Sequence, residues 1–210
     1  MKISVSSLPY NDNIIEKMPE IVNSGADFLH LDIMDGSLTK NKTFLDEKVK
    51  EINSKSTIFL DCHLMINDPL NVLKNYVKTG ANIISIHYEA FKNKSDLIKA
   101  LKYLKQNKVI AGLAIYPKTK IEEILPYFEF FDLLLIMSVE IGEYGQKFID
   151  STLNKISLAK KLIPNKLIEV DGGINLENIN YLKELDVDIV VIGGSFYKSE
   201  NKKEFVKNLK

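Results

Sequence analysis

Eight short apolar segments recur along the 210-residue chain at nearly regular spacing, and this pattern restricts its possible folds more than any other feature of the sequence. The segments are rich in leucine and β-branched residues and are bounded by turn residues. They cover residues 2–6, 27–34, 57–65, 82–89, 109–116, 132–139, 167–173 and 188–195. Short, nearly continuous apolar runs of this kind are typical of parallel β-strands that are buried on both faces.

Amphipathic stretches with the periodicity of α-helices lie between these segments. They cover residues 12–23, 69–79, 96–106, 119–128, 151–162, 176–185 and 199–209, and a weaker helical pattern covers 45–53. Eight strands that alternate with about eight helices predict an α/β protein that folds as a single (β/α)8 barrel domain over residues 1–210. A doubly wound open sheet is the alternative, but no Gly-x-Gly-x-x-Gly motif follows the first strand.

The composition gives no sign of a nucleic-acid or membrane partner. The chain has 28 Lys+Arg against 28 Asp+Glu, and it contains no apolar run long enough for a signal peptide or a membrane span. Its single cysteine, Cys62, excludes an internal disulfide and fits a reducing compartment, so we expect a cytoplasmic protein. All 28 cations are lysine. A bound phosphate would therefore be held by backbone N–H groups, hydroxyls or lysine.

The segment LHLDIMDG, residues 29–36, combines an apolar strand pattern with polar side chains. Because side chains alternate along a strand, His30, Asp32 and Met34 share one face, while the leucines and Ile33 take the other. Burial of an uncompensated charge is costly, so polar groups inside a protein are normally paired or bound to a metal. This strand therefore points to a buried polar site.

Histidines and aspartates lie late in several of the predicted strands, at the end of the barrel where active sites are found. His30 and Asp32 from one strand, His63 from the next and Asp171 from across the barrel would form a set of two imidazoles and two carboxylates. Such a set suits Zn²⁺, Fe²⁺, Mn²⁺ or Co²⁺. The alternative is a group of hydrogen-bonded core histidines. For His87 we expect a hydrogen-bonding or shape role, and for Cys62 a buried position facing the helices.

Methionines and glycine pairs complete the predicted site. Met34, Met65 and Met137 come at strand ends, either as core residues or as an apolar cap that excludes water. The sequences DGGIN (171–175) and IGGS (192–195) follow the last two strands. Barrels of this class frequently bind phosphate at these two loops through backbone amides, which glycine lets the anion approach closely.

The motifs KISVSSL (2–8), HLDIMDG (30–36), DCHLM (61–65), GQKF (145–148) and EVDGGI (169–174) resemble those of the ribulose-phosphate 3-epimerase family, which includes allulose-6-phosphate 3-epimerase. The likeness covers almost the whole chain. It implies an isomerase of carbohydrate metabolism, in the pentose phosphate pathway, that inverts carbon 3 of a ketose phosphate such as D-ribulose 5-phosphate. It also implies one divalent metal ion, an enediolate intermediate, a small phosphorylated ketose as substrate and a homo-oligomeric state.

The same resemblance assigns roles to residues. Asp32 and Asp171 would be the two proton carriers, and together with His30 and His63 they would be the metal ligands. The substrate-binding residues would be Ser6, His63, Gly142, Gly145, Gln146, Asp171, Gly172, Gly173, Gly194 and Ser195. Met34, Met65 and Met137 would cap the site.

Two loops depart from the family pattern. The family's loop Asn-Pro-Gly-Phe-Gly-Gly-Gln is EIGEYGQ here (140–146), and His-Phe-Val-Pro-Asn is SLTKN (37–41). Because the four predicted metal ligands are present, we expect the reaction type of the family. The loop differences leave the preferred sugar open, with allulose 6-phosphate as the alternative substrate.

A sugar-phosphate lyase or aldolase is a rival function, but the predicted strand cores hold no lysine for a Schiff base. A sugar-phosphate-binding paralogue without catalytic activity is the non-enzymatic alternative.

Overall fold

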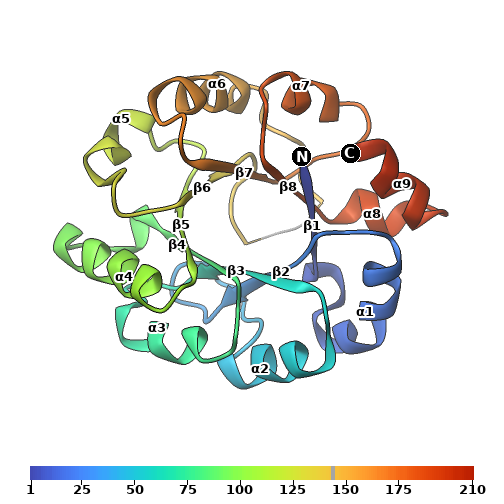
Figure 1. Cartoon of the computed structure of the whole chain (residues 1–210), viewed down its shortest axis with the longest axis horizontal. Helices are drawn as coiled ribbons and strands as arrows, with labels where there is room; N and C mark the ends of the chain where they lie inside the picture. Colours follow the sequence, from blue (N-terminus) through green and yellow to red (C-terminus); the bar gives the residue numbers. More distant parts are fainter. Residues whose placement is uncertain (143–144) are drawn as a thin grey trace.

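The computed structural model describes residues 1–142 and 145–210, and its eight parallel strands close into a barrel. Each strand pairs with its neighbours in sequence, and β1 pairs with β8 to complete the ring (Figure 1). The strands are β1 (Lys2–Ser6), β2 (Phe28–Met34), β3 (Phe59–Met65), β4 (Ile83–His87), β5 (Ile110–Ile115), β6 (Leu133–Met137), β7 (Leu167–Asp171) and β8 (Ile189–Ile192). The expected (β/α)8 barrel, the TIM-barrel fold, is thus confirmed.

Helices surround the ring of strands on its outside (Figure 1). They are η1 (Leu8–Asn13), α1 (Ile14–Asn23), α2 (Asp46–Lys55), α3 (Leu70–Val77), η2 (Tyr88–Ala90), α4 (Lys94–Gln106), α5 (Ile121–Ile124), η3 (Leu125–Tyr127), α6 (Thr152–Leu162), α7 (Ile179–Glu184), α8 (Gly194–Lys198) and α9 (Lys202–Leu209). The weak pattern at 45–53 does form a helix. The expected helix at 119–128 divides into α5 and η3, since Pro126 has no N–H to continue α-helical hydrogen bonding.

Several expected strands end earlier than their apolar patterns suggest, and for two of them the difference bears on the site. The strand expected over 82–89 ends at His87, and Glu89 lies in the turn η2. The strand expected over 188–195 ends at Ile192, so that Gly194 and Ser195 begin the short helix α8. Both corrections move polar or flexible residues from the strands into the connections that surround the mouth of the barrel.

Alternation along the strands divides the core into two parts. On β6, Leu134 and Ile136 belong to the large cluster between the strands and the helices, whereas Leu133, Leu135 and Met137 belong to a smaller cluster inside the barrel. Cys62 lies in the outer cluster, as expected from its position one residue before His63. Inward positions of β1, β3, β4 and β7 include the buried polar side chains of Ser4, Asp61, Ser85 and Glu169, so the barrel interior is only partly apolar.

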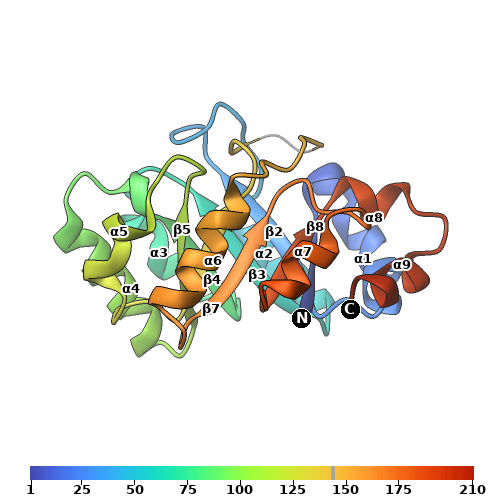
Figure 2. The ribbon, with the colours of Figure 1, turned by 90° about the horizontal axis from the view of Figure 1, so that it is seen from above.

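The loops after β2 and β6 both stand above the same end of the barrel (Figure 2). They contact each other there, because the Asn41 side-chain amide donates a 2.6 Å hydrogen bond to the Gly142 carbonyl oxygen. Among the described residues, no helix is long and apolar enough to cross a membrane.

Candidate active site

Four polar side chains converge beneath the mouth of the barrel. His30, Asp32, His63 and Asp171 each offer one ligand atom, and these four atoms all lie within 4.8 Å of one another. Both histidines are fully buried, and Asp32 is 4% exposed. The structure therefore brings together the four residues that were expected to form the metal site.

Strand register explains why residues so far apart in sequence meet here. Asp32 and His63 are direct partners in the β2–β3 pairing, and His30 occupies the same face of β2 one repeat lower. Asp171, the last residue of β7, reaches the group from the opposite side of the closed barrel. Strand alternation places the side chains of His30, Asp32 and His63 on the inner face, and closure of the ring brings Asp171 close to them.

The geometry of the four residues fits a divalent metal ion. His30 Nε2 has no hydrogen-bond partner in the described part of the chain, although it is fully buried. It lies 3.4 Å from Asp32 Oδ1 and 3.8 Å from Asp171 Oδ2, and His63 Nδ1 lies 3.3 Å and 3.9 Å from the same two atoms. Neighbouring ligand atoms around a tetrahedral ion with bonds of about 2.1 Å are about 3.4 Å apart.

A second layer of carboxyl groups lies deeper in the barrel. Asp61 Oδ2 is 2.6 Å from His30 Nδ1 and also accepts a 2.8 Å hydrogen bond from the Ser4 hydroxyl. Glu169, fully buried, belongs to the same group of ligand-type atoms as His30 and Asp61. Because Nδ1 of His30 is engaged by Asp61, its Nε2 is the atom directed toward Asp32 and Asp171.

Asp61 and Glu169 were not anticipated from the sequence, although a signal for them was present. Each stands two residues before a predicted ligand, His63 or Asp171, in the same strand. Strand alternation therefore places both on the inner face of the barrel.

His87 contacts His63 rather than joining the group of four. The two Nε2 atoms are 2.7 Å apart, and His87 Nδ1 is 3.2 Å from Glu89 Oε2. This hydrogen-bonding position agrees with the role expected for His87. Burial lowers the pKa of both imidazoles, that of His87 to about 4, so both rings are neutral near pH 7.

The two aspartates of the group have opposite pKa shifts. Burial raises the pKa of Asp171 to about 7, despite the nearby charge of His30. Burial acts on Asp32 in the same direction, but the nearby charge of His30 and the hydrogen-bonded contact with His63 outweigh it and hold the pKa of Asp32 well below its usual range. Without a metal ion, Asp32 is therefore the base of the pair and Asp171 is protonated at or below neutral pH.

Metal binding is expected to weaken as the pH falls below about 7. Burial raises the pKa of Asp171 to about 7, so at lower pH a proton occupies this carboxyl group and must be released when the metal binds. The apparent affinity for Zn²⁺ should then fall, from this group alone, by up to about tenfold per pH unit. Titration calorimetry in buffers of different ionisation enthalpy measures the released protons. An affinity that is flat between pH 5 and 7 would contradict this assignment.

A cavity of about 840 Å³ lies directly above the buried group. The residues expected to bind substrate that line it are Ser6, Gly142, Gly145, Gln146, Asp171, Gly172, Gly173, Gly194 and Ser195, and Asp32, an expected proton carrier and metal ligand, lines it as well. Met65 and Met137 also line the cavity, whereas Met34 and His63 are buried beneath it. Lys147 and Lys198 line it as well and were not anticipated. Of the loop 140–146, Glu143 and Tyr144 lie outside the described residues.

The turn after β7 is held in a conformation that favours glycine. Gly173 has φ +66°, and a Cβ atom placed on it would lie 2.3 Å from the backbone nitrogen of Phe148. The Asn178 amide donates a 2.9 Å hydrogen bond to the Gly173 carbonyl oxygen. Nearby, the Ser195 hydroxyl donates a 2.7 Å hydrogen bond to the Ile174 carbonyl oxygen, which joins the turn to the start of α8.

Gly173→Ala is expected to displace this turn and reduce kcat/KM by about 100-fold, since a shift of about 1 Å in a binding group can cost that much. The new Cβ atom would overlap backbone atoms, which cannot move aside as a flexible side chain can. Steady-state kinetics measures the effect. Gly25→Ala is the matched control, because Gly25 also has a positive φ (+83°) but has nothing within 4 Å of the added Cβ. Equal kinetic losses in both variants would contradict the role of the turn.

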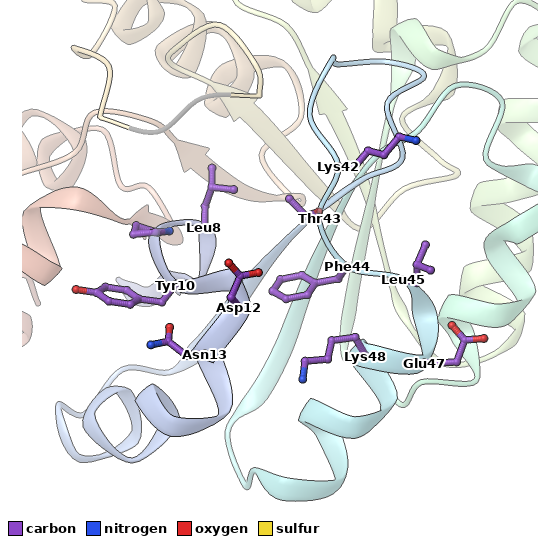
Figure 3. Close-up of a pocket in the computed structure, with 11 residues that line it drawn as sticks. Leu8, Tyr10, Asp12, Asn13, Lys42, Thr43, Phe44, Leu45, Glu47 and Lys48 are labelled. Carbon is purple, nitrogen blue, oxygen red and sulfur yellow. The ribbon is translucent and has the colours of Figure 1, made fainter.

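A second hollow, of about 690 Å³, lies outside the barrel between η1 and the start of α2 (Figure 3). Its charged side chains do not point toward one another but are spread around the hollow. They are those of Asp12, Lys42, Glu47 and Lys48. None of them belongs to either group of potential metal ligands found among the described residues. The candidate active site is therefore the barrel mouth.

Comparison with known proteins shows the family to which the sequence is similar. A family model described as the ribulose-phosphate 3 epimerase family matches residues 2–197. A ribulose-phosphate 3-epimerase of Chlamydia trachomatis is 38% identical over 187 residues, which cover 86% of this chain and 79% of the relative. That of Bacillus subtilis is 33% identical over 199 residues, covering 92% and 90%.

Solved structures of more distant proteins share the fold. Phosphoribosyl anthranilate isomerase from Thermotoga maritima superposes with a TM-score of 0.73 at 17% identity, covering 100% of this chain and 98% of that one. KGPDC from Streptococcus mutans gives a TM-score of 0.75 at 16% identity, covering 99% of this chain and 94% of that one. At these identities the likeness concerns the barrel fold alone.

Proposed function

Because the chain belongs to the ribulose-phosphate 3-epimerase family, a family of isomerases, we propose that it interconverts D-ribulose 5-phosphate and D-xylulose 5-phosphate by moving a proton at carbon 3. The observation that carries this proposal is the pair Asp32 and Asp171. These carboxyl groups come from opposite sides of the barrel, border one cavity and have pKa values shifted in opposite directions.

Inversion at a carbon atom requires one group to remove a proton and another to return it on the opposite face. Asp32 would remove the proton from one epimer, and Asp171, which borders the same cavity from another strand, would deliver one from the other side. In the reverse reaction the two exchange roles. The Ser6 hydroxyl donates a 3.0 Å hydrogen bond to Asp32 Oδ2 and so holds this carboxylate in place.

We propose that a divalent metal ion is held by His30, Asp32, His63 and Asp171. When bound, it would supply positive charge where negative charge develops on the enediolate oxygens. Asp61 orients His30 through Nδ1. Met65 and Met137, which line the cavity beside the aspartates, would restrict the access of water to the reacting carbon.

The phosphate group of the substrate would lie at the turn after β7 and the start of α8. Gly173, Gly194 and Ser195 line this end of the cavity, where the glycines leave backbone N–H groups accessible. The chain contains no arginine, but Lys147 and Lys198 line the same cavity and would supply cationic charge.

Allulose 6-phosphate is the alternative substrate, because Glu140, Gly142, Gly145 and Gln146, from a loop that departs from the family pattern, line the cavity. Loop 37–41, which also departs from that pattern, contacts this loop through Asn41. The test is NMR detection of deuterium incorporation at C3 in D₂O, run in parallel on ribulose 5-phosphate and allulose 6-phosphate. Exchange and epimerisation of ribulose 5-phosphate support the proposal, and exchange of allulose 6-phosphate alone assigns the alternative. Absence of exchange with both sugars in metal-loaded protein would support the paralogue without catalytic activity.

The cellular setting and assembly also belong to this proposal. The single thiol, Cys62, is free and buried, which supports a reducing compartment and hence a cytoplasmic enzyme. A homo-oligomer is the expectation from the family resemblance, and sedimentation velocity of the purified protein tests it.

A further inference from the structure

A line of three side chains, two buried imidazoles and a partly buried carboxylate, runs from the group of four to the outer edge of the barrel mouth. His63 Nδ1 faces Asp32 and Asp171, while its Nε2 lies 2.7 Å from Nε2 of His87. The other nitrogen of His87 lies 3.2 Å from Oε2 of Glu89. Both imidazole rings are fully buried.

The proton positions along this line are mutually dependent. Two Nε2 atoms at 2.7 Å need one proton between them, so one ring is the donor and the other the acceptor. If His63 donates, its Nδ1 keeps a free lone pair toward the two aspartates, and His87 carries its proton on Nδ1, directed at Glu89. If His87 donates instead, His63 carries its proton on Nδ1, where it blocks metal binding.

The surroundings of Glu89 favour the first arrangement. Its Oε1 accepts a 2.8 Å hydrogen bond from the backbone N–H of Tyr116 and another from the Thr119 hydroxyl. Burial raises the pKa of Glu89, but the hydrogen bonds from His87, Thr119 and Tyr116 outweigh it and keep this carboxyl group ionised. An ionised carboxylate accepts hydrogen bonds only, so Oε2 requires the proton on Nδ1 of His87.

In the metal-free protein, Asp32 favours the other tautomer of His63, the one with its proton on Nδ1. Its Oδ1 lies 3.3 Å from His63 Nδ1 and could accept a proton there. The tautomer of His63 is therefore set by competition between Asp32 at one end of the line and Glu89 at the other.

We propose that Glu89, acting through His87, is a positioning residue that holds His63 in the tautomer with an unprotonated Nδ1, ready to bind a metal. The proposal rests on the metal site of the proposed function. His30 has the analogous support directly, because Asp61 lies at its Nδ1. Each of the two histidine ligands would thus be oriented by a carboxylate, one in direct contact and one through a second imidazole.

Glu89→Gln is the decisive variant, because it keeps the side-chain volume and reverses one hydrogen bond. The backbone N–H of Tyr116 can only donate, so the Gln carbonyl oxygen must occupy the position of Oε1. Its NH₂ group then faces His87 Nδ1 and donates to it. His87 must carry its proton on Nε2, and His63 must carry its own on Nδ1.

Two measurements test this chain of consequences. Imidazole ¹⁵N NMR of the metal-free protein should show His63 protonated at Nε2 in the unmodified protein and at Nδ1 in Glu89→Gln. Competition of the protein with a chromophoric chelator for Zn²⁺ should show an affinity about 10- to 100-fold lower in the variant. His87→Phe, which keeps a ring but removes both nitrogens, should also lose Zn²⁺ affinity and replaces Glu89→Gln if that variant does not fold.

Thr119→Val is the matched control, because it removes one hydrogen bond to Glu89 without reversing any other. Its His63 tautomer and Zn²⁺ affinity should remain those of the unmodified protein. An unchanged tautomer in Glu89→Gln, or equal Zn²⁺ losses in Glu89→Gln and Thr119→Val, would overturn the proposal. If the tautomer changes as expected but the unmodified protein binds no Zn²⁺, then the proposed metal site fails while the tautomer assignment stands.

Discussion

Asp171→Asn is expected to reduce the rate of epimerisation by about 10³- to 10⁴-fold, at the upper end of what general acid–base catalysis contributes. The variant keeps the shape of the side chain but can neither accept nor donate the C3 proton. The fold should tolerate it, because burial raises the pKa of Asp171 to about 7 and the site therefore already favours a neutral group. Coupled-enzyme kinetics measures the loss, and thermal unfolding measures the stability.

Hydrogen exchange distinguishes the loss of one proton carrier from the loss of the whole site. With Asp171 replaced, Asp32 can still remove the C3 proton from the epimer that presents it on that side. Deuterium incorporation from this one epimer should therefore decline less than interconversion. Asp68→Asn, at an exposed aspartate in the loop after β3, is the control and should retain full activity. Near-normal turnover by Asp171→Asn would rule out the two-base mechanism.

Combined replacement of the two imidazoles, His30→Ala with His63→Ala, is expected to reduce bound divalent metal from one ion per chain to background and to abolish activity. Asp32 and Asp171 would then be the only members of the group left, and two carboxylates cannot bind a metal ion as well as four ligands can. Elemental analysis of the purified variant measures the metal content. Stability should fall as well, since His30 contacts Asp32 and Asp61 and its loss leaves buried charges without a partner.

If the double variant does not fold, the single variant His63→Ala tests the metal site instead. His63→Ala leaves the contacts of His30 with Asp32 and Asp61 in place, and it should still lose most of its bound metal. Cys62→Ala is the matched control, because this residue precedes His63 but belongs to the core between the strands and the helices. Full metal content in His63→Ala, or equal metal loss in Cys62→Ala, would contradict the assigned site.

Much of the fold and of the buried group was predictable because both depend on simple repeats. Apolar runs separated by amphipathic stretches indicate a barrel, and alternation within LHLDIMDG places His30 and Asp32 on one face. The contribution of Asp171 followed once the strands were assumed to close into a ring. Helix lengths were less predictable, since features such as Pro126 act over only a few residues.

The supporting residues were harder to predict, for physical reasons that differ from case to case. Asp61 and Glu169 share the inner face with the predicted ligands, but the contact through which Asp61 orients His30 depends on a distance that the sequence does not contain. Glu89 was assigned to a strand, and only its actual place in η2 brings it to His87. Lys147 and Lys198 lie in connections, where no repeat indicates which side chains face the cavity.

The hydrogen bond between Asn41 and the Gly142 carbonyl oxygen joins the two loops in which this chain departs most from its relatives. The two segments are 101 residues apart in sequence, yet they meet above one cavity. A change in the shape of either loop therefore alters the surface that the other must fit. A graft of the loop from a relative would be compatible with this barrel only if both segments were exchanged together.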